Sequence, residues 1–134
     1  MQEQFTELAA SLRAALDEIP QGMRQEAVSR QVIIILLAGA LRQMGLVPVP
    51  AWRPPRSTRD RLDLVGVVPD SDPPRVEVAV VVDPLVELAK VRAMEWVDCP
   101  HKVVVTYSDR PDKVKQSTFF LTPGLTHINL YGKV

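Results

Sequence analysis

Residues 61–82 of this 134-residue chain, RLDLVGVVPDSDPPRVEVAVVV, decide how the sequence folds. Two apolar segments, residues 61–68 and 75–82, flank a short connection that contains three prolines. Both segments are rich in β-branched residues, so the stretch predicts two strands joined by a turn. Side chains alternate between the two faces of a strand. A hairpin with an even register would therefore place Asp63 and Glu77 on the same face.

These two carboxylates interrupt segments that are otherwise strongly apolar. Charged side chains are rarely buried unless they are paired with an opposite charge or bind a metal ion. Two interpretations stay open. Asp63 and Glu77 bind a metal ion, or one of them forms an ion pair with Arg61 or Arg75 at the end of a strand.

The composition is that of a globular protein with one domain, residues 1–134. Hydrophobic residues make up 46% of the chain and charged residues 24%, which lies within the usual range for such a domain. The 16 basic side chains balance the 16 acidic ones. A strong global field that attracts nucleic acid is thereby excluded, and any basic surface must be local.

Several features predict a cytoplasmic protein that does not insert into a membrane. Cys99 is the single cysteine, which excludes an internal disulfide and a cysteine-rich zinc site and favours a reducing compartment. The longest apolar run, residues 32–41, is shorter than the roughly 20 residues that span a bilayer. Acidic Glu3 and Glu7 do not fit the pattern of a signal peptide.

Two helices are predicted before the strands. Apolar residues at helical spacing make residues 1–20 an amphipathic helix, which packs either on the domain or on a partner, as a homodimer or with another protein. A second helix covers residues 23–44, with Gly45 as its C-terminal cap. The middle of this helix, residues 32–41, is apolar on all sides and is expected to be deeply buried.

The rest of the chain predicts an alternation of strands and helices. Asp83 is the expected N-cap, and Pro84 the first residue, of a helix that runs to about Val97. The remaining segments are expected to be an edge strand, a buried strand, a polar connection with one helical turn, and two extended pieces, at residues 46–52, 102–107, 108–115, 118–121 and 126–131. The order α-β-β-β-α-β implies a mixed sheet with helices on its faces.

This order, with Asp63 on one strand and Glu77-Val78-Ala79 on the next, resembles the core of the PD-(D/E)XK, or restriction-endonuclease-like, superfamily. The resemblance covers roughly residues 23–107, with an extra helix before it and an extension of the sheet, residues 108–134, after it. It implies an αβββαβ fold in which Asp63 and Glu77 are catalytic and hold Mg²⁺ or Mn²⁺. Glu26, from the first core helix, is the matching candidate for a third metal ligand.

The resemblance also implies metal-dependent hydrolysis of phosphodiester bonds in DNA, but the sequence departs from the family at the lysine of the motif. Ala79 occupies that position and cannot supply a charge. Loss of one preorganised electrostatic contact typically lowers a rate by about 10²–10³-fold. The following helix offers Arg92 and Lys90 as substitute cations. Arg92 is the better aimed of the two if the apolar stripe of that helix consists of Leu85, Leu88, Ala89 and Trp96.

A local group of basic residues precedes Asp63. In a nucleic-acid-binding protein this loop would contact phosphates and stack its tryptophan on a base. In the alternative interpretation the loop is solvated and the tryptophan closes the edge of the core. The residues concerned are Trp52, Arg53, Arg56, Arg59 and Arg61.

The sequence thus leaves three functions open. The first is a metal-dependent nuclease. The second is a catalytically inactive domain of the same fold that serves nucleic-acid binding or protein assembly, which the missing lysine, the zero net charge and the apolar N-terminal helix favour. The third is an unrelated α/β domain whose strand carboxylates are structural. A nucleotide-binding enzyme with a glycine-rich phosphate loop is excluded, because the six glycines are scattered.

Overall fold

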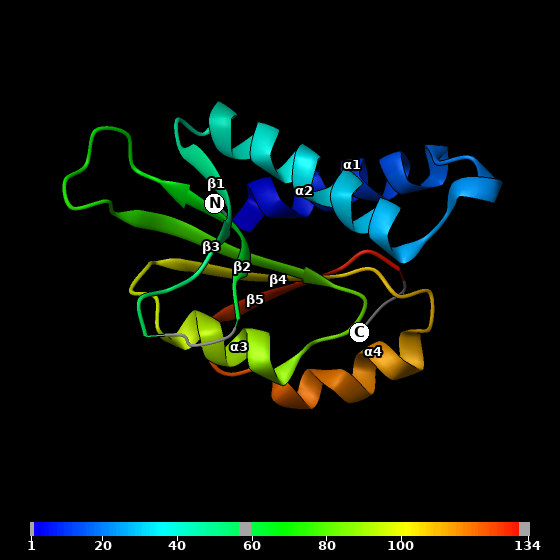
Figure 1. The fold of residues 1–134 in the computed structure, drawn as a ribbon. Coiled ribbons are helices and arrows are strands. Elements are labelled where there is room, and N and C mark those ends of the chain that lie inside the picture. The colour runs from blue at the N-terminus through cyan, green and yellow to red at the C-terminus, as the bar shows by residue number, and fades with distance from the viewer. Residues whose placement is uncertain (1, 57–59, 132–134) are drawn as a thin grey trace.

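The computed structural model describes residues 2–56 and 60–131, which form a sheet of five strands between two layers of helices (Figure 1). In chain order the elements are α1 (Gln2–Glu18), the 3₁₀ turn η1 (Gln21–Met23), α2 (Glu26–Gln43), β1 (Val47–Trp52), β2 (Leu62–Val67), β3 (Val76–Asp83), α3 (Leu88–Glu95), β4 (His101–Thr106), α4 (Pro111–Ser117), the 3₁₀ turn η2 (Thr118–Phe120) and β5 (Leu125–Asn129).

The sheet is mixed, as the sequence predicts. Its strand order is β1-β2-β3-β4-β5 within the described residues. The first three strands form an antiparallel meander, whereas β3, β4 and β5 run parallel to one another. Parallel neighbours need a crossover connection, and α3 and α4 provide it. The expected class, a mixed α/β sheet flanked by helices, is confirmed.

Helices α1 and α2 cover one face of the sheet (Figure 1). The apolar side of α1 is buried in this layer through Phe5, Leu12 and Leu16, which belong to the same core cluster as Val80 of β3. Of the two roles that the sequence left open for residues 1–20, packing on the domain is therefore the observed one. The apolar side of α1 is not available to a partner.

The start of α3 differs from the prediction. Asp83 does not cap a helix: it is the last residue of β3, where it pairs with Thr106 of β4, and α3 begins at Leu88. The strand hydrogen bonds to β4 thus override the local Asp-Pro signal for a helix start. The apolar stripe predicted for α3 is also wrong, because Leu88 is 39% and Trp96 50% exposed.

The side of α3 that packs on the sheet consists of Val91, Ala93 and Met94, which belong to a second core cluster with Ala79 and Val81 of β3. The two clusters lie on opposite faces of the sheet because successive residues of β3 alternate between them.

Two further expectations are corrected. The middle of α2 is not buried all round: Leu37 is 1% exposed, but Ile35 is 66% and Leu36 38% exposed. A helix in an outer layer turns only one face to the sheet, so its other side meets solvent. Residues 118–120, expected to be extended, form η2. No helix in the described part of the chain combines the length and apolarity needed to cross a membrane.

Candidate functional site

Asp63 lies at the start of β2 and is 5% exposed. Its Oδ1 accepts hydrogen bonds from Arg30 Nη2 of α2 and, at 3.2 Å, from Lys90 Nζ of α3. Its Oδ2 accepts a hydrogen bond of 2.6 Å from the backbone N–H of Val82 in β3. Arg30 also donates from Nε to the carbonyl oxygen of Val82 at 3.2 Å. Both carboxylate oxygens are therefore occupied by donors of the domain itself.

The backbone explains why a carboxylate is needed here. Strand β2 pairs with β3 from Leu64, opposite Val80, onward, so the ladder stops short of Val82. The N–H of Val82 would otherwise lack an acceptor, and a buried unpaired N–H costs free energy. On the other side, Ala51 of β1 has φ 55°, which interrupts the pairing beside Asp63. The Asp63 side chain thus replaces a missing backbone acceptor.

Glu77 lies far along β3 from Asp63. The register places Asp63 level with Val81, next to the pair Leu64 and Val80. Glu77 is four residues away from Val81, a distance of about 13 Å at about 3.3 Å per residue. It sits beside the irregularity between Gly66 and Val67 and is half-buried. The structure does not bring the two predicted carboxylates together.

Lys90, not Arg92, is the cation that reaches the site. Lys90 contacts Asp63, whereas Arg92 is exposed on α3. The sequence favours Arg92 because its helical wheel places Leu88 and Trp96 against the sheet, and both are exposed in the structure. Val91 and Met94 pack against the sheet, and Lys90 lies beside them on α3. Its long side chain can therefore reach Asp63 at the start of β2.

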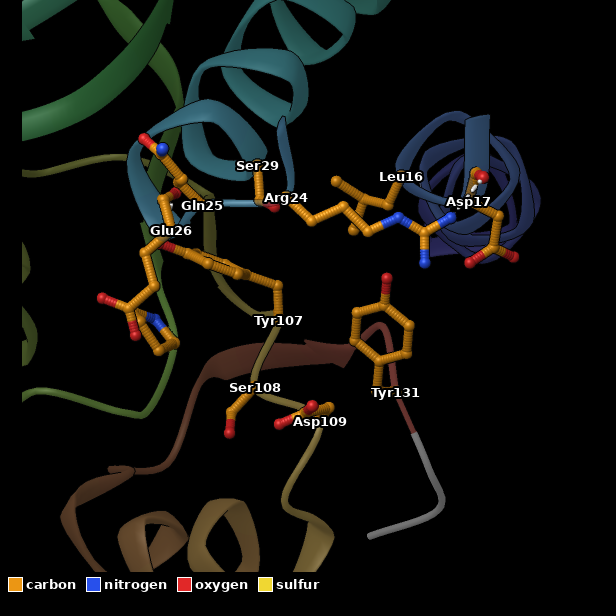
Figure 2. A pocket seen from close by; sticks show the side chains of 11 residues that line it. Leu16, Asp17, Arg24, Gln25, Glu26, Ser29, Tyr107, Ser108, Asp109 and Tyr131 are labelled. Carbon is orange, nitrogen blue, oxygen red and sulfur yellow. Dashed lines mark hydrogen bonds between the residues drawn. The ribbon is translucent and has the colours of Figure 1, made fainter. Parts of the chain in front are cut away.

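Glu26 and Asp63 line different pockets. Figure 2 shows the pocket of Glu26, a cavity of about 320 Å³ where the rings of Tyr107 and Tyr131 lie across from each other. Burial, together with the nearby carboxylate of Glu26, raises the pKa of Tyr107 to about 12. Asp63 opens instead into a separate cavity of about 350 Å³, which Arg30 and Lys90 also line.

Asp83 is a polar residue of this region that the sequence reasoning assigned to another role. Its Oδ2 is buried and has no hydrogen-bond partner among the residues that the structure describes. Burial raises the pKa of Asp83, and the positive charges of Lys90 and Arg30 oppose that rise. One signal could have revealed this position: the β-branched run of residues 80–82 leads directly into Asp83, which favours a continuing strand over a cap.

The predicted nucleic-acid loop is partly engaged within the domain. Trp52 is half-buried and packs on the α3 side of the sheet, where it lines a hollow of about 1030 Å³ with Trp96. The guanidinium of Arg56 lies 6.0 Å from the centre of the Trp96 ring, and Arg61 donates to the carbonyl oxygen of Ala51 at 3.1 Å. Arg59 lies outside the described residues.

The predicted metal ligands Asp63, Glu77 and Glu26 do not fit a shared Mg²⁺ ion. Mg²⁺ requires free oxygen ligands at about 2.0–2.1 Å in octahedral geometry. Asp63 already accepts hydrogen bonds at both oxygens, Glu77 is displaced along β3, and Glu26 lines another pocket. Across residues 2–56 and 60–131, no three His, Cys, Asp or Glu side chains form a group that could hold a metal ion.

Comparisons with known proteins add no relative: no family model, no curated protein and no solved structure matches this chain.

Proposed function

We propose that the chain is a catalytically inactive domain with a restriction-endonuclease-like core, and that it serves in protein assembly. The order α2-β1-β2-β3-α3-β4, with an antiparallel meander and a parallel crossover strand, supports the core. The observation that carries the proposal is the engagement of Asp63 by Arg30, Lys90 and the N–H of Val82. A carboxylate held in this way acts as a structural link.

The chemistry of the neighbouring residues supports the same conclusion. A hydrolase needs its metal-binding carboxylates free and a positive charge aimed at the substrate. Here the positive charges of Arg30 and Lys90 are directed at Asp63. Ala79, at the position of the family's lysine, is fully buried and carries no functional group. Hydrolysis would require this ion-pair group to open.

Exposed apolar side chains favour assembly with protein over binding to nucleic acid. The net charge is zero, and Arg56 and Arg61 both have partners within the domain. Contiguous exposed apolar patches mark protein contacts, whereas singly exposed apolar residues do not. Ile35 and Leu36 are two adjacent exposed apolar residues of α2. In the described part of the chain the exposed large apolar side chains are Met23, Ile35, Leu36, Val47, Leu88, Trp96, Phe119 and Phe120.

A melting experiment with Mn²⁺ tests the inactive-domain proposal. We expect the melting temperature of the parent to be the same with and without millimolar Mn²⁺, because an ion that does not bind cannot stabilise the fold by mass action. Asp63→Asn should lower the melting temperature equally in both conditions, and Glu77→Gln serves as the matched carboxylate control. A rise with Mn²⁺ in the parent that disappears in Asp63→Asn, together with cleavage of DNA, would contradict the proposal.

Metal-dependent hydrolysis of DNA is the second candidate, and one observation favours it. The buried Oδ2 of Asp83 has no partner in the described residues, and Lys90 lies close enough to influence it electrostatically. A site built on Asp63 and Asp83 would place a lysine beside two carboxylates. In that case Asp83→Asn, and not only Asp63→Asn, would abolish a stabilisation by Mn²⁺.

A further inference from the structure

The outer face of α2 carries a row of exposed residues at a spacing of four. Gln31, Ile35, Gly39 and Gln43 are all exposed, and Ile35 is 66% exposed although it lies in the middle of the helix. Residues spaced by four form a continuous ridge on a helix and are the usual contact row between two packed helices. We call these four residues the α2 row. Figure 1 shows α2 along the top of the molecule, with the sheet below it.

Gly39 is not required sterically inside the monomer. A glycine in the interior of a helix costs about 1 kcal/mol relative to alanine. A Cβ atom at Gly39 would meet nothing within 4 Å, so the fold itself does not require a glycine there. Gly66 is the opposite case, because a Cβ there would lie 3.0 Å from the side chain of Leu46. Because Gly39 has no side chain, the backbone of α2 is accessible at this position, and another chain can approach it closely.

The α2 row is complementary to itself. In an antiparallel pair of identical helices, residues whose numbers have a constant sum face each other. A pair centred at the level of residue 37 places Ile35 opposite Gly39 and Gln31 opposite Gln43. The side chain of Ile35 then packs against the exposed backbone at Gly39 of the other copy. The two-fold symmetry produces this contact twice. The two glutamine amides can donate to and accept from each other.

The neighbouring positions do not obstruct this pairing. Leu36, which is 38% exposed, lies beside the α2 row, whereas Ala38 packs against the core cluster and stays outside the contact. Residues 31–41 contain no charged side chain, so no like charges meet at the centre. The two copies of Arg42 lie at opposite ends of such a pair, so these charges do not meet either. The reciprocal contacts of Ile35 with Gly39 are what a two-fold symmetric interface requires.

From this self-complementarity we infer that the chain forms a homodimer through the α2 row, with the two α2 helices antiparallel. The inference rests on the proposed assembly role and names its partner, a second copy of the same chain. It also differs from the sequence-based expectation of a contact through residues 1–20, since the apolar side of α1 is committed to the core.

Light scattering on the full-length protein tests the interface. The parent is expected at twice the chain mass of 14.9 kDa over micromolar to millimolar concentrations. Ile35→Glu places a charge in the row and should raise the dissociation constant at least tenfold. Leu88→Glu is the matched control, because Leu88 is also an exposed apolar residue of a helix but lies on α3, on the opposite side of the sheet. Both variants alter exposed positions and should keep the parent's circular dichroism spectrum.

A swap of two residues tests the register. Gly39→Ile should weaken the dimer because two isoleucine side chains then meet. Ile35→Gly should weaken it because no side chain packs against Gly39 of the other copy. The double variant, with both changes in one chain, again pairs isoleucine with glycine across the axis. We expect it to recover at least tenfold in affinity over Gly39→Ile.

Several outcomes would overturn the inference: a monomeric parent, a dimer that Ile35→Glu leaves intact, or a double variant as weak as Gly39→Ile. These results are separate from those that test catalysis. A monomer whose melting temperature does not respond to Mn²⁺ would overturn the dimer and leave the inactive-domain proposal standing. A dimer whose melting temperature rises with Mn²⁺ through Asp63 would support the dimer and overturn the inactive-domain proposal.

Discussion

At the scale of single residues, the decisive group is the one around Asp63. A buried carboxylate is costly, and it persists when donors compensate its charge. Arg30 and Lys90 come from helices on opposite sides of the sheet, and both bond to the same oxygen. The residue that most resembles a metal ligand in the sequence is therefore one whose charge two cations of the domain compensate.

Asp83 provides a pH-dependent prediction. Because its pKa is raised above 3.8 by burial, the folded state binds this proton more tightly than the unfolded chain does. The contribution of Asp83 to the free energy of unfolding is thus least favourable above the raised pKa and improves as the pH falls through it. Asp83→Asn should be more stable than the parent at pH 7, and the difference should vanish at a pH below about 3.8.

Urea denaturation at both pH values measures this difference, with Asp109→Asn at an exposed position as the control. A variant that is less stable than the parent at neutral pH, or a difference that does not change with pH, would contradict the assigned cause.

At the scale of the elements, α3 is the helix whose orientation the sequence did not predict. Met94 is fully buried against the sheet, whereas Leu88 on the same helix is 39% exposed. We expect Met94→Ala to lower the free energy of unfolding by about 2–5 kcal/mol, as usual for a buried methionine. Leu88→Ala should lower it by less than about 1 kcal/mol. Equal losses, measured by urea denaturation, would show that α3 is rotated.

The order and type of the elements from α1 to β4 could be predicted because they follow from local patterns. Alternating and β-branched segments predicted the meander and the buried strand β4, and the mixed sheet followed from their order. The start of α3 could not be predicted, since Asp83-Pro84 fits both a helix cap and the end of a strand. Pairing between Asp83 and Thr106, which are far apart in sequence, decides between the two.

The candidate site was only partly predictable for a similar reason. Asp63 could be singled out because a charge in an apolar strand is unusual. Its partner Arg30 lies 33 residues earlier in the chain, on a helix whose rotation is set by packing of Leu37 and Leu41. The sequence offers Lys90 as a candidate but favours Arg92, because the buried stripe of α3 depends on contacts with the sheet that the sequence does not show.

At the scale of the whole molecule, Asp63 connects both helical layers to the start of β2 and the end of β3. Arg30 links it to α2 and Lys90 links it to α3, while the N–H of Val82 links it to β3. The domain thus uses the carboxylate to hold its layers in place, while residues on the outer face of α2, such as Ile35, stay exposed.

The most direct test of this account is the free energy of unfolding of Asp63→Ala against Glu77→Ala, by urea denaturation. Removing one member of a buried ion pair costs about 3–5 kcal/mol, and the partial exposure of Arg30 and Lys90, 32% and 20%, reduces that figure. We predict a loss of about 2–4 kcal/mol for Asp63→Ala and less than about 1 kcal/mol for Glu77→Ala. An Asp63→Ala variant as stable as the parent would contradict the account, because a carboxylate that stabilises nothing is free for catalysis.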